Sequence, residues 1–255
     1  MNYLEISIAE HCNLNCKYCS HFSPIAKPIF ADVNETKNGV LLLKELIGDD
    51  IKDIRVLGGE PLLHPELVKF CTMLREHFLR SRIAVVTNGI LLSKLSSDVL
   101  TEFNNNNIEI IITKYPIKLD EDELEHIKKL YGLKISYTNR SKTIKKMNHM
   151  PLDLNGTQNI NDNFKICYSA RCTNLKGTKI YPCPIVASIE HFNSYFSVEL
   201  PVSNNDYLDL QKCKTKKQIT DFLSKPIPFC AYCKRNEITY NLPWQISTKH
   251  IKEWT

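Results

Sequence analysis

The chain has 255 residues, of which 43% are hydrophobic and 24% charged, as is typical of a globular protein with one large or two modest domains. Its net charge of +5, from 33 basic and 28 acidic residues, is too small to indicate nucleic-acid binding. The first ten residues lack the pattern of a signal peptide, and no apolar run approaches the roughly 20 residues of a membrane helix. We therefore expect a cytoplasmic protein without membrane contact, in which ten cysteines indicate metal ligands rather than disulfides.

Short apolar runs alternate with helical patterns over the first 140 residues. The apolar runs predict buried parallel strands over 3–8, 53–58, 82–87, 108–113 and 133–138. The stretches between them predict helices over 34–48 with Asn34 as the candidate cap, over 64–79, and over 119–132 between Asp120 and Gly132. Such alternation predicts right-handed strand–helix–strand units, and hence an α/β fold built on a parallel sheet or a complete or partial barrel.

The pattern changes in the second half of the chain. We expect a boundary that separates a domain of residues 1–147 from a linker and smaller region of residues 148–255. Within the second region, residues 172–184 predict a tight hairpin that turns near Gly177. Residues 216–225 predict a short helix.

Three cysteines follow the first predicted strand directly. Cys12 and Cys16 are separated by three residues, and Cys16 and Cys19 by two. A structural zinc site is closed by four protein ligands, and three neighbouring cysteines cannot all be paired in disulfides. A [4Fe–4S] cluster has four irons, so three thiolates would leave one iron open for another ligand. A zinc site completed by His11 or His21 is the alternative.

Turns with ligand-binding character follow the next two predicted strands. In βα folds such turns lie at the carboxyl ends of the strands, where active sites form. The sequence GGEP over 58–61 combines two glycines, which allow close approach to the backbone, with Glu60, whose carboxylate suits an amine. The sequence TNG over 87–89 offers groups that can hydrogen-bond hydroxyls. Ordinary tight turns are the alternative for both.

The CxxxCxxC motif, with Tyr18 before its last cysteine, and the GGEP turn together resemble the radical S-adenosylmethionine (SAM) superfamily. The resemblance covers roughly residues 1–140 and implies a partial (β/α) barrel of the TIM type. It also implies that a [4Fe–4S] cluster binds SAM at its open iron and cleaves it to a 5′-deoxyadenosyl radical, which abstracts hydrogen from the substrate. An external reductant such as flavodoxin or ferredoxin would supply the electron.

The resemblance assigns roles to particular residues. It makes Cys12, Cys16 and Cys19 the cluster ligands. It places Tyr18 near the adenine of SAM and Thr87 or Asn88 near the ribose. The residues that would hold the methionine amine are Gly58, Gly59 and Glu60.

The second half contains six further cysteines, and their pattern resembles the auxiliary-cluster extensions called SPASM and, in shortened form, twitch. Two fully thiolate-ligated clusters would need eight cysteines, so we expect one auxiliary [4Fe–4S] cluster. The expected ligands are Cys167, Cys183, Cys230 and Cys233, with Cys172 as a competitor for Cys167. Five residues, rather than the usual four, separate Gly177 from Cys183. A zinc knuckle is the alternative.

A radical SAM domain followed by a twitch-like region resembles a dehydrogenase of sugar-like alcohols. It implies that the chain oxidises or modifies a sugar-like small molecule, with the auxiliary cluster as electron acceptor. Radical modification of a peptide or protein, by a maturase or an activating enzyme, is the second hypothesis. A non-catalytic iron–sulfur or zinc module is the third.

The remaining assignments concern single side chains. His21 and Ser23 follow the cysteine motif and Tyr115 follows the fourth strand, so all three are candidate substrate contacts. Cys71 lies between apolar residues of a predicted helix and is expected in the core. Cys213 lies among lysines and is expected in a loop, as is the run Asn104–Asn107.

Overall fold

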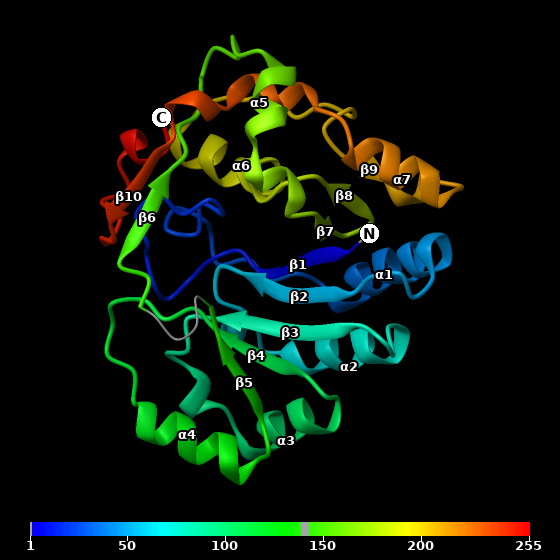
Figure 1. The fold of residues 1–255 in the computed structure, drawn as a ribbon, viewed down its shortest axis with the longest axis vertical. Coiled ribbons are helices and arrows are strands. Elements are labelled where there is room, and N and C mark those ends of the chain that lie inside the picture. The colour runs from blue at the N-terminus through cyan, green and yellow to red at the C-terminus, as the bar shows by residue number, and fades with distance from the viewer. Residues whose placement is uncertain (1, 139–142) are drawn as a thin grey trace.

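The computed structural model describes residues 2–138 and 143–255. Its centre is a sheet of eight strands in the order β5-β4-β3-β2-β1-β7-β8-β9 (Figure 1). The first five strands are β1 (Tyr3–Ala9), β2 (Asp53–Gly58), β3 (Arg82–Thr87), β4 (Glu109–Ile112) and β5 (Lys134–Tyr137). Each of these strands pairs in parallel with the next. The predicted α/β fold with a partial barrel is confirmed.

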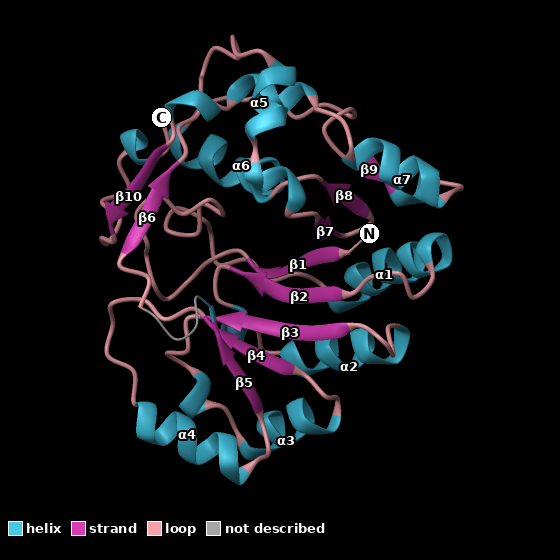
Figure 2. Ribbon diagram, viewed as in Figure 1, coloured by secondary structure: helices cyan, strands magenta, loops and turns pink. Residues whose placement is uncertain are grey.

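Helices follow the parallel strands in turn (Figure 2). They are α1 (Val33–Ile47), α2 (Leu67–His77), α3 (Ser97–Asn105) and α4 (Glu121–Leu130). Side chains from these helices, such as Val40, Phe70 and Phe103, share one buried core with the strands. Removal of these apolar faces from water holds the helix layer against the sheet.

The second half of the chain extends the same sheet. Strand β7 (Asn174–Lys176) pairs in parallel with β1 and forms the predicted hairpin with β8 (Lys179–Tyr181), which in turn pairs with β9 (Leu208–Asp209). Gly177 turns this hairpin with a φ of +55°, a conformation that glycine adopts without strain. The helices are α5 (Ile160–Ile166), α6 (Pro184–Phe196) and α7 (Lys216–Leu223). The last of these confirms the short helix expected there.

A separate two-stranded sheet lies beside the main one (Figure 1), formed by β6 (Lys146–His149) and β10 (Thr239–Pro243). A second apolar core, which includes Phe22, Phe192 and Trp254, lies around α6. Most residues of this second core come from the second half, although Phe22 belongs to the first, and the two halves share the main sheet. The boundary between residues 147 and 148 stays a prediction.

Three local predictions differ from the structure. Asp32, and not Asn34, caps α1, because its carboxylate accepts a hydrogen bond from the Glu35 N–H at 2.8 Å. Helix α2 begins at Leu67 rather than residue 64, since a proline at 65 disfavours helical geometry in the residue before it. The run Asn104–Asn107 is not only a loop, because its first two residues close α3. Asp120 does cap α4 as expected.

Close packing of α1 against the β7–β8 turn generates a first prediction. A Cβ added at Gly39 would overlap the backbone carbonyl oxygen of Gly177. Gly39→Ala should therefore lower the free energy of unfolding by about 1–3 kcal/mol, the usual effect of overpacking, although alanine favours helix. Chemical denaturation under anaerobic conditions measures the change. Asn38→Ala, at an exposed position of the same helix, is the control. Equal stability of the two variants would contradict this packing.

Candidate active site

A cavity of about 450 Å³, here called the main cavity, lies at the carboxyl ends of the parallel strands. It is lined by all twelve residues that the sequence assigned to the first cluster, to SAM or to substrate, namely Cys12, Cys16, Tyr18, Cys19, His21, Ser23, Gly58, Gly59, Glu60, Thr87, Asn88 and Tyr115. They come from the loops after β1, β2, β3 and β4. The structure therefore brings the predicted site together, while the role of each residue stays a prediction.

The three cysteines of the first motif line the main cavity as a set of thiols that polar groups support. The Leu14 N–H points at the Cys12 sulfur at 3.3 Å, and the Trp244 indole N–H donates to the Cys16 sulfur at 3.1 Å. Donors of this kind stabilise thiolates, which are the form that binds iron. The donor set therefore fits an iron–sulfur cluster.

The described thiols are not gathered into a group that is already arranged around one zinc ion. Thiolates around one tetrahedral zinc lie about 3.8 Å apart, as follows from a Zn–S distance of about 2.3 Å. Among the described residues, no group of three or more possible ligand atoms that lie within 4.8 Å of one another includes a cysteine.

The GGEP turn is joined to the cysteine loop by the backbone. The Gly59 N–H donates to the Ala9 carbonyl at 2.6 Å, and the Glu60 N–H donates to the His11 carbonyl at 3.0 Å. A Cβ on Gly58 or Gly59 would overlap the carbonyl oxygen of Ala9 or His11, respectively. Both glycines are thus required for two loops to touch, in addition to any approach by a ligand.

The Glu60 carboxylate is 1% exposed and connects the loop after β2 to the loop after β3. One of its oxygens accepts from the Thr87 hydroxyl at 2.7 Å and from the Leu62 N–H at 3.0 Å, and the other accepts from the Asn88 N–H at 2.9 Å. Burial raises the pKa of Glu60, and these three donors offset part of that effect. Beyond its predicted contact with an amine, Glu60 therefore fixes the position of Thr87 and Asn88.

Tyr18 adopts a backbone conformation that is unusual for a residue with a side chain. Its φ is +65°, in the left-handed region, and its ring lies 4.8 Å from the ring of His149 on β6. Strained backbone of this kind often marks a functional loop. The arrangement presents the Tyr18 ring at the wall of the main cavity, where it is expected to meet an adenine.

Sequence reasoning missed the C-terminal segment that braces the cysteine loop. Besides the bond from Trp244 to Cys16, the Trp254 indole N–H donates to the Cys19 carbonyl at 2.9 Å. The Lys17 N–H donates to the carbonyl of Gln245 at 2.9 Å. The chain has only two tryptophans, and both contact this loop, so their rarity was the one available signal.

Four of the remaining cysteines line a second, smaller cavity, here called the thiol cavity. They are the predicted auxiliary ligands Cys167, Cys183, Cys230 and Cys233. The competitor Cys172 lines the main cavity instead. Cys183 precedes the first turn of α6, where unpaired backbone N–H groups favour a thiolate. The four thiols come from three separate segments, and their chemistry fits one further cluster.

The other two cysteines lie where the sequence predicted. Cys71 on α2 is buried in the main core, and burial raises the pKa of its thiol to about 12. Cys213 follows a short 3₁₀ turn, and its thiol contacts the Asp209 carbonyl at 3.4 Å. Neither lines the main cavity or the thiol cavity.

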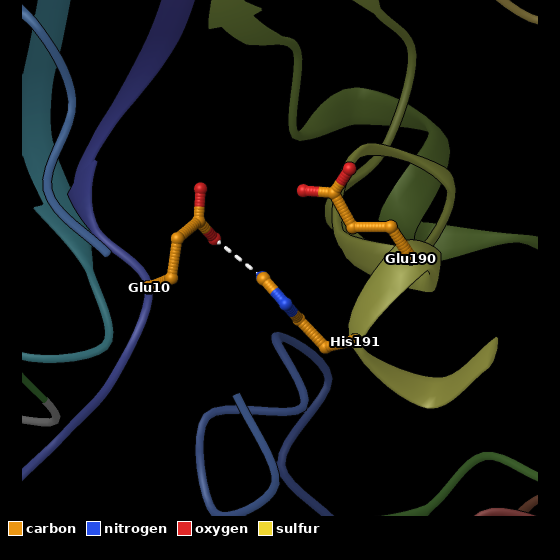
Figure 3. A group of neighbouring side chains, drawn as sticks. All are labelled: Glu10, Glu190 and His191. Atoms are coloured by element: carbon orange, nitrogen blue, oxygen red, sulfur yellow. Dashed lines mark hydrogen bonds and ion pairs between the residues drawn. The ribbon is translucent and has the colours of Figure 1, made fainter. Parts of the chain in front are cut away.

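Glu10, Glu190 and His191 are the one group among the described residues whose ligand atoms lie close enough for a single metal ion (Figure 3). The His191 imidazole contacts the Glu10 carboxylate at 2.8 Å, and the Lys176 amine lies 2.9 Å from Glu10 and 2.6 Å from Glu190. Burial opposes ionisation, but His191 and Lys176 lower the pKa of Glu10 to about 2. Lys176 therefore already supplies the positive charge that a metal ion would bring to these carboxylates.

No helix within the described residues has the length and apolar character needed to cross a lipid bilayer.

Residues 6–157 match the radical SAM superfamily, and the chain belongs to it. Among curated proteins, it is 35% identical over 94 residues to Molybdenum cofactor biosynthesis protein 1 of Bos taurus, which is 37% of this chain and 15% of that protein. It is 34% identical over 112 residues to the GTP 3′,8-cyclase of Alkaliphilus oremlandii, which is 44% of this chain and 35% of the cyclase. The matched segments thus span well under half of these relatives.

Among solved structures, the crystal structure of BtrN in complex with AdoMet and 2-DOIA is similar over the whole chain. The TM-score is 0.56 at 16% identity, with 100% of this chain and 97% of the BtrN chain covered. At this identity the likeness shows a shared fold. It includes the C-terminal half, which lies beyond the segment shared with the superfamily. As a member of the superfamily, the chain is expected to bind SAM and a [4Fe–4S] cluster.

The two sets of thiols predict the iron content. Anaerobically reconstituted protein should bind about eight irons, four for each cluster. Replacement of Cys12, Cys16 and Cys19 together by alanine should leave about four, because the thiol cavity is intact. Iron and zinc are measured by elemental analysis, and Cys213→Ala is the control that should keep all eight. Zinc in the triple variant, or no metal at all, would contradict the second cluster.

The Glu60 contacts predict an effect on SAM affinity. Glu60→Gln places an NH₂ group against at least one existing donor, so a contact worth about 1–3 kcal/mol is lost and the Thr87–Asn88 turn loosens. SAM affinity should fall by about five- to 150-fold, as equilibrium dialysis of cluster-loaded protein measures. The control is Glu66→Gln, which removes an exposed carboxylate paired with Lys69. Unchanged SAM affinity in Glu60→Gln would show that the hydrogen bonds from Thr87 and Asn88 to Glu60 are not needed for SAM binding.

Proposed function

We propose that this chain is a two-cluster radical SAM enzyme that oxidises a sugar-like small molecule. The observation that carries the proposal is the thiol cavity, in which Cys167, Cys183, Cys230 and Cys233 meet beside the main cavity. A redox-neutral radical reaction needs one cluster, whereas this chain devotes four further cysteines to a second site. Support also comes from the fold shared with BtrN, whose crystal structure contains AdoMet and 2-DOIA.

The volume of the main cavity, about 450 Å³, lies within the range of small-molecule binding sites. When bound, the first cluster supplies the electron that cleaves SAM to a hydrogen-abstracting radical. The lining of the main cavity also includes the polar residues Glu5, His21, Ser23 and Ser169. Buried atoms in this group, His21 Nε2 and Ser23 Oγ, have no hydrogen-bond partner among the described residues. A substrate that carries several hydroxyl groups would satisfy them.

The main cavity is lined by the exposed Lys146 and by the buried Glu5, and the buried carboxylate favours a neutral or cationic substrate over a polyanion. The carboxylate of Glu5 is 6% exposed and lines the cavity, and it accepts hydrogen bonds from the Tyr3 hydroxyl and, at 3.0 Å, from the Asn174 amide. No ion pair involves Glu5 in the described part of the chain, so a cationic group of the substrate would balance its charge.

Oxidation of an alcohol also explains a second cluster. Removal of a hydrogen atom from the carbinol carbon leaves a substrate radical. A net two-electron oxidation to the carbonyl then requires that this radical lose one proton and one electron. When bound in the thiol cavity, an auxiliary cluster supplies the acceptor for that electron. An external one-electron reductant would serve the first cluster.

The proposed substrate class is tested by isotope transfer. Reduced enzyme is incubated with SAM and a panel of sugar and cyclitol alcohols that carry deuterium at the carbinol carbons. A true substrate should transfer deuterium into 5′-deoxyadenosine and yield a carbonyl product. SAM cleavage with no deuterium transfer from any panel member would contradict a sugar-like alcohol and favour a peptide substrate.

Loss of the second cluster should separate hydrogen abstraction from oxidation. In Cys230→Ala, SAM cleavage and deuterium transfer should continue, because the main cavity is unchanged, while the ratio of carbonyl product to 5′-deoxyadenosine should fall at least about tenfold. Chromatography of both products measures the ratio, with spectroscopy to verify the first cluster. Cys213→Ala is the matched control. A folded Cys230→Ala enzyme with a normal ratio would indicate that the second site only stabilises the fold.

A further inference from the structure

A buried cation lies in the wall of the thiol cavity. Arg235 follows Cys233 by two residues and is only 5% exposed. The ion pairs found within the described residues, all with N···O distances up to 4.0 Å, include none that involves Arg235. A buried guanidinium without an anion is unfavourable, so its presence indicates a partner of negative charge.

The contacts of the guanidinium point to sulfur. One terminal nitrogen lies 3.9 Å from the Cys233 sulfur, and the other lies 3.3 Å from the Met150 sulfur. Neutral thiol and thioether sulfurs are weak acceptors, and a guanidinium has five N–H donors. Apart from these two sulfur contacts, no hydrogen bond from the Arg235 guanidinium is found within the described residues.

Arg235 also lies between the two cavities. Met150, which it contacts, lines the main cavity, while Arg235 itself lines the thiol cavity. The Tyr168 hydroxyl, in the wall of the main cavity, contacts the same Met150 sulfur at 2.8 Å. The cation is therefore held on the side of the thiol cavity that faces the proposed substrate.

We propose that Arg235 is the fixed countercharge of the auxiliary cluster and raises its reduction potential. This inference rests on the proposed function, because it requires a cluster at the four thiolates. Reduction by one electron makes the thiolate-ligated cluster more negative, and a nearby buried cation stabilises that added charge more than it stabilises the oxidised state. The cluster thereby becomes a better acceptor for the electron that a substrate radical must lose.

Burial distinguishes Arg235 from the other cation at this cavity. Lys225 also lines the thiol cavity, but its side chain is exposed to solvent. Water and salt screen an exposed charge, whereas a buried charge acts through a medium of low dielectric constant. The same loss of one positive charge should therefore have a large effect at Arg235 and a small one at Lys225.

The test uses the full-length chain with Cys12, Cys16 and Cys19 replaced by alanine, so that only the auxiliary cluster can form. Arg235→Gln, Arg235→Lys and Lys225→Gln are each introduced into this parent. The reduction potential is measured by a redox titration followed by electron paramagnetic resonance. Arg235→Gln should lower the potential by at least about 59 mV, a tenfold change in the one-electron equilibrium constant. The other two variants should shift it much less.

Each possible result supports or contradicts the role proposed for Arg235. An intact cluster with unchanged potential in Arg235→Gln, or an equal shift in Lys225→Gln, would overturn the inference. Loss of iron in Arg235→Gln but not in Arg235→Lys supports it, because positive charge alone then holds the cluster. Loss of iron in both variants would show that the shape of the arginine matters rather than its charge, and would also overturn it. A parent without iron would refute the proposed second cluster instead.

Discussion

The contact between the cysteine loop and the GGEP turn is the constraint on which the site depends. Two backbone hydrogen bonds, from Gly59 to Ala9 and from Glu60 to His11, hold these loops in contact. A side chain at Gly58 or Gly59 would prevent this close approach. The Glu60 carboxylate also fixes the next loop, because it accepts hydrogen bonds from Thr87 and Asn88. Three consecutive βα loops are thus held as one unit, in which the position of each ligand-binding group depends on the others.

Residues of the C-terminal half also contact the cysteine loop. Trp244 contacts the sulfur of Cys16, and Trp254 contacts the carbonyl of Cys19, so the cysteine loop is held between the barrel and the end of the chain. The pairing of β7 with β1 joins the same two halves within the main sheet. A cluster at the three cysteines would therefore be enclosed by residues from both halves, which limits the access of water to its thiolates.

The sequence predicted the parallel strands well because each is a short, buried apolar run. Once the strands are placed, the site residues follow, because they lie at the strand ends and in the loops after them. The main cavity accordingly contains every residue assigned to SAM and substrate. Tertiary partners could not be predicted in the same way. Trp244 and Cys16 are 228 positions apart, and no local pattern of charge or hydrophobicity links them. Asn34 does not cap α1, because the helix begins one residue earlier, at Val33, and Asp32 therefore occupies the capping position.

The two cavities are coupled mechanically as well as by proximity. Glu10 lies two residues before Cys12, and its carboxylate is held by His191 on α6, the helix that begins directly after Cys183 (Figure 3). Lys176 on β7 adds an ion pair to the same carboxylate. A shift of the cysteine loop would therefore strain the helix that presents a thiol to the second cavity. Such rigidity would suit the proposed electron transfer, because it would keep the distance between the substrate site and the second cavity constant while substrates and products exchange.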